Sequence, residues 1–536
     1  MSTFFVIDVI FGYKSLKKNH LERKMRVVFV LFDSLVRKSM GCYGGTHIKT
    51  PRFDEFSKRA VTFDNHYVGS LPCMPARRDL HTGRLNFLHR SWGPLEPFDN
   101  SFSEIIRSRG THTHLITDHY HYFEDGGSTY HNRYTTWDFI RGQEWDKWKV
   151  MVQPPIERFQ EKYHEIQHPL DSKDPYGDGR LQGIINRESM QDESDYCCPR
   201  SVDAALQFLD ENHDKNNWFL HLECFDPHEP FNAPERFKKQ YETGYDGPIF
   251  DWPRYKRHSE TDELTAEMKA NYAALVTMCD EYFGKLIDHF DKYNMWSDTA
   301  LILTTDHGFM LEEHEWWGKN RMPFFNEIAN IPLIIHHPDY AGLAGTRRQA
   351  LTQVIDLMPT ILDMFGLKPD NYVEGLSLLP LLGAEIKIHE SVMYGMFGAG
   401  TNITDGRYTY FRYPEDMTAT DLFDYTLMPM RQKTLYDVDV LSETTLVDDF
   451  SFSKGARLLK IPARRNAKGQ PVGHLGQGGG YEDTTTVLYD LHKDPNQNHP
   501  FRDNVIEEKM TSALKDLMKK NEAPKEAFER LDIDPS

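Results

Sequence analysis

The sequence predicts an α/β fold with a largely parallel sheet flanked by helices, followed by a smaller α+β region. Two observations predict the sheet and its helices. Short apolar runs, β-branched or aromatic and bounded by polar or turn residues, are typical of buried strands. They lie at 25–32, 113–117, 218–224, 300–305 and 331–335. An amphipathic helix is expected among them, and strands that alternate with helices favour a layered α/β domain.

That helix is predicted over 265–290, where apolar residues recur at steps of three and four. Its expected buried face consists of Met268, Tyr272, Leu275, Cys279, Tyr282, Leu286 and Phe290. In a parallel sheet, sites collect where loops leave the carboxyl ends of the strands. We therefore expect functional side chains after residues 32, 117, 224 and 305.

The third observation is a change in the sequence pattern near residue 385. Strand-like segments at 391–397, 407–413 and 485–491 and a final helix around 504–520 predict a smaller α+β subdomain over 386–536. The main domain is expected over 25–385. Residues 1–24 are expected to be an extension, since Met25 precedes the first good strand. The stretch 454–480 carries GQGGG without a strand–loop–helix context and is interpreted as a surface loop.

Within the main domain, residues 122–200 form an insertion with little periodicity. Three tryptophans, Trp137, Trp145 and Trp148, lie close together in it. One interpretation is a core patch under a long loop. The other is a wall of a substrate cleft, where aromatic faces stack on a sugar or an aryl group.

Composition narrows the function classes. Of the 536 residues, 39% are hydrophobic and 13% aromatic, which argues for a buried core and against disorder. The net charge of −19 disfavours a general nucleic-acid binder. Six scattered cysteines do not form a disulfide framework or a zinc motif. We find no membrane span and no secretory signal, so we expect a cytoplasmic protein without a membrane partner, with a periplasmic location as the alternative.

The segment SLPCMPARRDLHTGR, residues 70–84, carries the most chemical information. Pro75 and Gly83 are expected to start and stop a two-turn helix. This helix would place Cys73 at an N-terminus that favours anions, with Arg77 one turn away on the same face. Two interpretations follow: an activated cysteine in a cationic setting, or a buried structural cysteine before a helix.

The same segment resembles the sulfatase signature C-x-P-[SA]-R-x-x-x-[LM]-T-G-R, with His81 where Leu or Met is usual. Further segments are similar to sulfatase motifs in the same order. They are FDSLVRKSMGCYG (32–44), FDPHEPF (225–231), TTDHGFMLEEHEWWGKN (304–320) and LYDLHKDPNQ (488–497). The resemblance spans about residues 25–500 and implies the alkaline-phosphatase-like sandwich, with a large mixed, mostly parallel sheet flanked by helices.

The resemblance implies that Cys73 is converted to formylglycine by a maturation enzyme, and that the hydrated aldehyde supplies the nucleophile. It also implies a divalent cation held by Asp33, Asp306 and His307 together with residue 73. Such a cation and nearby positive side chains offset the charge of a sulfate ester. Oxygen-rich ligation favours Ca²⁺ or Mg²⁺, whereas the histidine leaves Mn²⁺ open.

The implied mechanism is a double displacement: one hydroxyl of the hydrated formylglycine attacks sulfur and expels the alcohol, and collapse of the hemiacetal then releases sulfate and restores the aldehyde. His228 is expected to protonate the leaving alcohol, Lys319 to hold a sulfate oxygen, and Arg77 to steady the charged nucleophile. The proton of the second hydroxyl then leaves to a base, and sulfate is released. His314 is a lesser candidate for substrate contact, since a hydrogen bond in support of the site explains it as well.

Two departures from the family pattern stand out. Ser34 occupies the place of a second aspartate, so the cation has three protein ligands plus formylglycine, or Ser34 coordinates weakly. Many sulfatases carry G-K-W-H after the next strand, whereas this chain has TDHYHYFEDGG (117–127) and no lysine there. We expect His121, and as second choice His119, to act as the base near formylglycine. One cationic contact to the substrate stays unassigned.

These observations predict a sulfatase that hydrolyses a sulfate monoester, with a carbohydrate sulfate favoured over an aryl sulfate. The first alternative is a phosphonate monoester or phosphodiester hydrolase of the same superfamily. A second, from another class, is an inactive protein that binds sulfated glycans, motivated by Ser34 and the missing lysine. A third is an unmodified thiol nucleophile, for which we find no activating histidine at a recognisable spacing.

Overall fold

The computed structural model describes residues 25–168, 179–321, 323–369, 372–417, 420–448, 450–463 and 483–536. The extension at 1–24 and most of the loop at 454–480 lie outside these residues. Within them, the main sheet has the strand order β12-β2-β11-β8-β1-β6-β4-β5. The strands are β1 (Arg26–Phe32), β2 (Val61–Phe63), β4 (His112–Thr117), β5 (Thr136–Phe139), β6 (Trp218–Cys224), β8 (Thr299–Thr304), β11 (Leu333–His336) and β12 (Arg347–Arg348).

The five apolar runs expected as strands correspond to β1, β4, β6, β8 and β11. The first four pair in parallel, as does β5 at the edge. By contrast, β11 runs antiparallel to both of its neighbours, β8 and β2. The prediction of a mixed, mostly parallel sheet is therefore confirmed.

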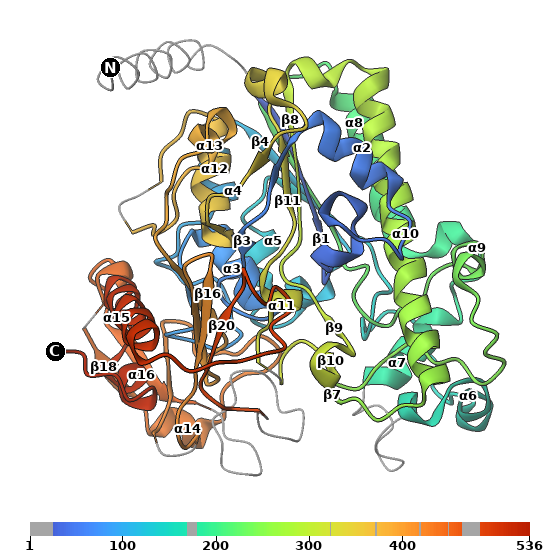
Figure 1. Ribbon diagram of the computed structural model, residues 1–536. Coiled ribbons are helices and arrows are strands. Elements are labelled where there is room, and N and C mark those ends of the chain that lie inside the picture. Colours follow the sequence, from blue (N-terminus) through green and yellow to red (C-terminus); the bar gives the residue numbers. More distant parts are fainter. Residues whose placement is uncertain are drawn as a thin grey trace.

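Helices cover both faces of this sheet (Figure 1). On one face lie α2 (Pro51–Arg59), α8 (Cys197–Asn212), α9 (Glu235–Lys238) and α10 (Asp262–Lys292). On the other lie α3 (Cys73–Thr82), α4 (Phe102–Ser108), α12 (Leu357–Met364) and α13 (Leu379–Gly383). The helix expected over 265–290 is α10, and all seven residues of its predicted buried face are buried.

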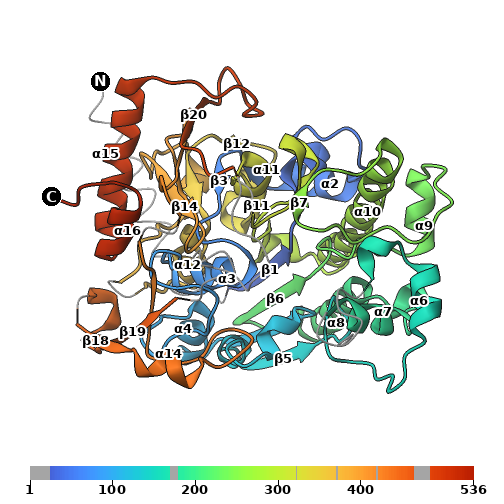
Figure 2. The same ribbon diagram turned by 90° about the horizontal axis from the view of Figure 1, so that it is seen from below.

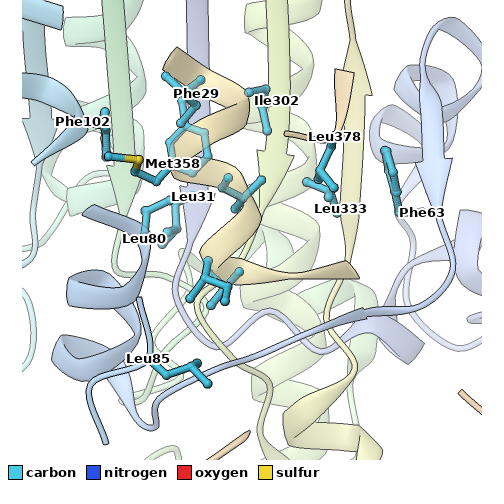
Figure 3. Close-up of a cluster of buried hydrophobic side chains, with 14 of the residues drawn as sticks. Phe29, Leu31, Phe63, Leu80, Leu85, Phe102, Ile302, Leu333, Met358 and Leu378 are labelled. Carbon is cyan, nitrogen blue, oxygen red and sulfur yellow. The ribbon is translucent and has the colours of Figure 1, made fainter. Parts of the chain in front are cut away.

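Alternation along β1 explains why the sheet needs cover on both sides. Its side chains point to opposite faces in turn, so Phe29 and Leu31 join one hydrophobic core while Val28 and Val30 join the other. Figure 3 shows Phe29 and Leu31 packed with Leu80 of α3 and Met358 of α12. Because both faces are buried, the strand is an unbroken apolar run rather than an alternating one.

The C-terminal region forms two smaller sheets, in agreement with the strand-like segments expected there. One has the order β14-β15-β16-β20 and the other β17-β19-β18. Their elements are β14 (Val392–Gly395), β15 (Thr401–Thr404), β16 (Tyr408–Arg412), β17 (Phe423–Thr426), β18 (Thr445–Val447), β19 (Leu458–Pro462), β20 (Val487–Asp490), α14 (Val438–Ser442), α15 (Asn504–Lys520) and α16 (Lys525–Arg530). Figures 1 and 2 place α15 and α16 on the opposite side of the molecule from α10.

The insertion at 122–200 has more regular structure than its sequence predicts. It contains α5 (Ser128–His131), α6 (Ile156–Lys162) and α7 (Gly179–Arg187), and it supplies β5 to the edge of the main sheet. Small strands complete the fold: β3 (His66–Tyr67) pairs with β13 (Thr352–Gln353), and β7 (Lys256–Arg257), β9 (Met310–Leu311) and β10 (Trp316–Gly318) form a ribbon. The short helix α11 is Asn326–Ala329.

Candidate active site

The ends of two neighbouring parallel strands and the start of α3 bring four candidate ligands together. Asp33 follows β1, and Asp306 and His307 follow β8, which pairs with β1. One ligand atom each from Asp33, Cys73, Asp306 and His307 lies within 4.8 Å of the others, and all four residues are buried. Two carboxylates and an imidazole in one pocket fit a divalent cation.

Helix capping sets the position of Cys73. The residue is the first of α3, as expected, and the helix ends at Gly83. Gly83 adopts a left-handed φ of 67°, and its N–H donates to the carbonyl of Asp79. The carboxylate of Asp79 in turn accepts hydrogen bonds from the backbone and hydroxyl of Ser70, at 2.6 and 2.9 Å. This ties the approaching loop to the helix and fixes where residue 73 points.

An unmodified Cys73 is a poor nucleophile in this setting. Burial raises the pKa of its thiol well above the ordinary value, so the thiolate is disfavoured at neutral pH. His307 does lie close, with Nε2 3.3 Å from Sγ, a neighbour that sequence spacing does not identify. However, His307 donates its Nδ1 proton to the carbonyl of Gly308, and burial lowers its pKa.

Arg77 binds carboxylates rather than residue 73. Its guanidinium donates to Asp306 at 2.6 Å, to Asp33 at 2.8 Å and to Glu223 at 2.6 Å. Burial opposes ionisation of Asp33, but Arg77 and then Lys319 outweigh it and hold its pKa well below the ordinary value. Arg77 therefore keeps Asp33 ionised and orients the carboxylates of both Asp33 and Asp306.

Sequence reasoning does not identify Glu223. It sits in the apolar strand β6 with 0% exposure, and Tyr122 also donates to it at 2.9 Å. The only signal in the sequence is an acidic residue near the carboxyl end of a buried strand, which is unfavourable without a partner. Arg77 is that partner.

Ser34 connects Asp33 to Lys319. Its hydroxyl donates to Asp33 at 2.8 Å and accepts from the Lys319 ammonium at 3.0 Å. Its backbone N–H donates to Asp306 at 3.1 Å from a left-handed φ of 63°. The hydroxyl thus links a ligand carboxylate to a cation, a role that differs from that of a second carboxylate.

His228 and Lys319 lie in the same cleft as Cys73. His228 donates from Nδ1 to the carbonyl of Glu229 at 2.6 Å, which leaves Nε2 for a substrate. Burial, followed by the charge of Lys319, lowers the pKa of His228 well below its ordinary value. The imidazole is therefore neutral until a negative charge enters the site.

The two histidines of the TDHYHYFEDGG segment are placed differently. His121 lines the cleft and donates from Nδ1 to Glu124 at 2.7 Å. His119 is 0% exposed and packs against Phe225, and neither of its ring nitrogens has a hydrogen-bond partner among the described residues. His121 is thus the one of the two that lines the cleft.

His314 and His81 have packing partners outside the cleft. The ring of His314 stacks on Phe325 at 3.6 Å, and its Nε2 lies 3.8 Å from Glu327. His81, the residue that departs from the signature, is buried and shares a hydrogen bond with Ser101 at 2.9 Å. Both fit a supporting role better than substrate contact.

The cleft that reaches Cys73 combines aromatic and charged walls. It is lined by Pro72, Cys73, Trp92, His121, Glu144, Trp145, Arg180, His228, Glu229, Trp252, Pro253, Tyr255, Lys319, Asn320 and Lys433. Of the three tryptophans in the insertion, only Trp145 lines it, whereas Trp137 is 41% exposed.

Lys433 supplies a cation that no motif indicates. It comes from the loop after β17 and stacks over Trp145 at 4.9 Å and Trp92 at 5.8 Å. Its neighbour Gln432 anchors this loop by donating to the carbonyl of His121 at 2.5 Å. A contact between distant parts of the chain thus brings a lysine to the cleft, where the family's usual lysine is missing.

Comparison with known proteins shows the family of the chain. A sulfatase family model matches residues 26–367, more than half of the chain. The chain belongs to the sulfatase family. A model for the C-terminal region of N-sulphoglucosamine sulphohydrolase also matches residues 312–447.

Individual relatives of this sulfatase are distant. The multifunctional alkaline phosphatase superfamily protein PehA of Trinickia caryophylli is 26% identical over 375 residues, covering 62% of this chain and 71% of PehA. An N-acetylglucosamine-6-O-sulfatase of Bacteroides thetaiotaomicron is 23% identical over 412 residues, covering 68% and 72%. The phosphonate monoester hydrolase of Agrobacterium radiobacter shares the fold, with a TM-score of 0.62, 18% identity and coverage of 92% and 95%.

Among the described residues, the structure holds no helix that is both long and apolar enough to span a membrane.

Proposed function

We propose that this protein hydrolyses a sulfate ester of a sugar, with formylglycine made from Cys73 as nucleophile and a divalent cation held by Asp33, Asp306 and His307. The observation that carries the proposal is the convergence on one buried point of three candidate ligands, the signature cysteine and the cations Arg77 and Lys319. An anionic ester needs such a concentration of positive charge to be attacked.

The ligand set fits the cation. Asp33 and Asp306 offer carboxylate oxygens and His307 its free Nε2, and all three are preorganised by hydrogen bonds. We favour Ca²⁺, with Mg²⁺ and Mn²⁺ as alternatives, because two of the three ligands are carboxylates. When bound, the cation polarises the sulfate group and neutralises its charge.

The formylglycine hydrate supplies a hydroxyl nucleophile that the buried thiol does not. The proposal therefore requires a maturation enzyme in the host as a partner of this chain. Since Cys73 is 3% exposed in the folded protein, we expect that enzyme to act on the chain before it folds.

The remaining residues bind the substrate and move protons. Lys319, 2% exposed and held by Ser34, donates to a sulfate oxygen. The incoming sulfate adds negative charge, which favours a proton on Nε2 of His228 for transfer to the leaving alcohol. His121, held by Glu124, accepts the proton that must leave before sulfate is released.

We propose a catalytic domain over 25–385 whose insertion at 122–200 shapes the cleft through Glu144 and Trp145. The subdomain over 386–536 contributes Lys433 to the same cleft.

A second candidate function is phosphonate monoester or phosphodiester hydrolysis, favoured by the fold shared with the Agrobacterium enzyme and by the similarity to PehA. Comparing kcat/KM on 4-nitrophenyl sulfate and 4-nitrophenyl phenylphosphonate separates the two. The proposal predicts the higher value for the sulfate. A preference for the phosphonate by orders of magnitude contradicts it. Absence of metal-dependent turnover of any sulfate ester, sugar sulfates included, favours a glycan-binding protein without activity.

A further inference from the structure

Two buried acids face each other in the cleft beside the catalytic groups. One ligand atom each from Glu144, His228 and Glu229 lies within 4.8 Å of the others. Glu144 comes from the insertion, and Glu229 follows His228 in the loop after β6. Neither acid contributes to the four-residue cluster around Cys73, so the proposed chemistry leaves both without a role.

Each acid has one oxygen held by a tyrosine. Tyr120 donates to Oε2 of Glu144 at 2.8 Å, and Tyr255 donates to Oε1 of Glu229. The second oxygen of Glu229, Oε2, lies 3.2 Å from Nδ1 of His228, but that N–H donates to the carbonyl of Glu229. No described residue donates a hydrogen bond to Oε2, although Glu229 is only 2% exposed. A buried acceptor without a donor is unfavourable unless a ligand supplies one.

The backbone at Glu144 is also unusual. Its φ of 40° lies in the left-handed region, which non-glycine residues rarely adopt. Such strain is typical of positions where the surrounding structure fixes a side chain for function. The unsatisfied oxygen of Glu229 and the strained residue that faces it therefore point to the same ligand.

Lysine and arginine side chains of the protein already lie over the tryptophan rings of the cleft, which argues against a cationic ligand. Lys433 lies over Trp145 and Trp92, and Arg180 lies 5.4 Å over Trp252. An organic cation bound against these rings would meet positive charge on each of them. Burial also raises the pKa of Glu144 to about 8, although Lys433 opposes this, so at neutral pH this acid offers a hydroxyl as well as an acceptor. Neutral hydroxyl groups suit such a pair better than an ammonium group does.

The geometry points to Glu144 and Glu229 as the residues that bind hydroxyl groups of the sugar ring carrying the sulfate. This inference rests on the proposed function and deepens it. The substrate class is a sulfated sugar with free hydroxyls near the ester, in preference to an aryl sulfate or the sulfate of a cationic alcohol. The tryptophans give the apolar faces against which such a ring packs.

The test compares Glu144→Gln and Glu229→Gln with the wild type on sulfates of glucose, galactose and N-acetylglucosamine, on 4-nitrophenyl sulfate and on choline O-sulfate. Glu374→Gln is the matched control, since Glu374 is partly buried, pairs with Arg84 and lies outside the cleft. We expect each cleft variant to lower kcat/KM on the best sugar sulfate by about 10- to 100-fold, as for a lost hydrogen bond to an acid. On 4-nitrophenyl sulfate we expect a smaller loss than on the sugar sulfate, since no hydroxyl contact is lost there. Some loss is expected for Glu229→Gln, because Oε2 of Glu229 lies 3.2 Å from Nδ1 of His228.

Three results overturn the inference. The first is an equal loss on sugar and aryl sulfates, which assigns the acids to folding or chemistry. The second is a wild-type preference for choline O-sulfate that the variants lose, which assigns them to a cation. The third is two bound metal ions per chain, falling to one in Glu144→Gln.

Calorimetric binding of the same sugar sulfates to Cys73→Ala, alone and combined with Glu144→Gln or Glu229→Gln, needs no turnover. Weaker binding in the double variants supports the inference, and unchanged binding overturns it. Failure of the proposed function is a separate result, namely the absence of sulfatase activity in the wild type.

Discussion

Replacing Arg77 with Met tests whether this side chain and a bound cation share the task of neutralising the candidate ligands. Arg77 is 1% exposed and donates to Asp33, Asp306 and Glu223. Methionine fills much of the same volume and leaves three buried carboxylates without the guanidinium, of which Asp33 still has Lys319 at 3.7 Å. Because removing one partner of a buried ion pair costs about 3–5 kcal/mol, and three partners lose contact here, we expect a loss of about 5 kcal/mol in the free energy of unfolding.

A divalent cation should recover part of this loss in stability, because it binds between two of the carboxylates that have lost the guanidinium. Urea unfolding in EDTA and in excess calcium measures the recovery. At a concentration 100 times the dissociation constant, a ligand of the native state adds about 2.7 kcal/mol. Since loss of the guanidinium strengthens the attraction for the cation, calcium should stabilise Arg77→Met by more than it stabilises the wild type.

Arg78→Met is the matched control. Arg78 is also buried and holds Asp99 through two hydrogen bonds, at 2.8 and 3.2 Å, in an ion pair separate from the cluster at Asp33 and Asp306. We expect a comparable loss of stability in EDTA, by about 3–5 kcal/mol, and the same response to calcium as in the wild type. An equal calcium effect in all three proteins would refute the assignment of the cation to Asp33 and Asp306.

Three further predictions concern the cleft. Cys73→Ala should abolish turnover of 4-nitrophenyl sulfate while circular dichroism stays unchanged; residual turnover near the wild-type rate would exclude residue 73 as the nucleophile. Burial and then Lys433 lower the pKa of His121, so Lys433→Gln should raise this pKa. The acidic limb of the pH profile of kcat/KM should then move to higher pH by up to about one unit. An acidic limb at the same pH in both proteins counts against His121 as the base. Burial raises the pKa of Glu144 from 4.5 to about 8, so the folded state binds the extra proton and stability falls between these pH values. In the wild type, the free energy of unfolding should therefore be a few kcal/mol lower at pH 9 than at pH 5, and Glu144→Gln should remove this difference. Urea unfolding at both pH values measures it, and an equal difference in both proteins contradicts the prediction.

Local sequence patterns predict much of the fold. The apolar runs become β1, β4, β6, β8 and β11, and each is buried on both faces except the beginning of β4, where His112 is exposed and His114 is half-buried. The helix α15 spans Asn504–Lys520, and Asp503 caps its N-terminus by accepting from the N–H groups of Val505 and Ile506. Periodicity and capping are properties of neighbouring residues, so the sequence alone contains them.

Strand order and direction are not local properties. The antiparallel course of β11 between β2 and β8 depends on how distant segments pair. The edge strand β5 escapes prediction for another reason: three of its four residues, in the sequence TWDF, are exposed. Such a strand lacks the apolar run by which the central strands are identified.

Some residues of the candidate site can likewise be predicted from local sequence patterns, and others cannot. Cys73, Asp33 and Asp306 follow from motifs, because each stands at a fixed place beside a strand end or a helix start. Glu223 and Lys433 do not, since their roles come from contacts with Arg77 and the cleft tryptophans, which are remote in sequence. The expected contact of Arg77 with residue 73 also gives way to carboxylate partners that only the folded chain brings within reach.

Residue 73 should act as the nucleophile after conversion to formylglycine, and the mass of one tryptic peptide shows whether that conversion occurs. Trypsin releases residues 60–77, which contain position 73 and no internal lysine or arginine. Protein purified from its own host should give the mass of an aldehyde in place of the thiol. A peptide that carries only the unmodified cysteine would contradict the account.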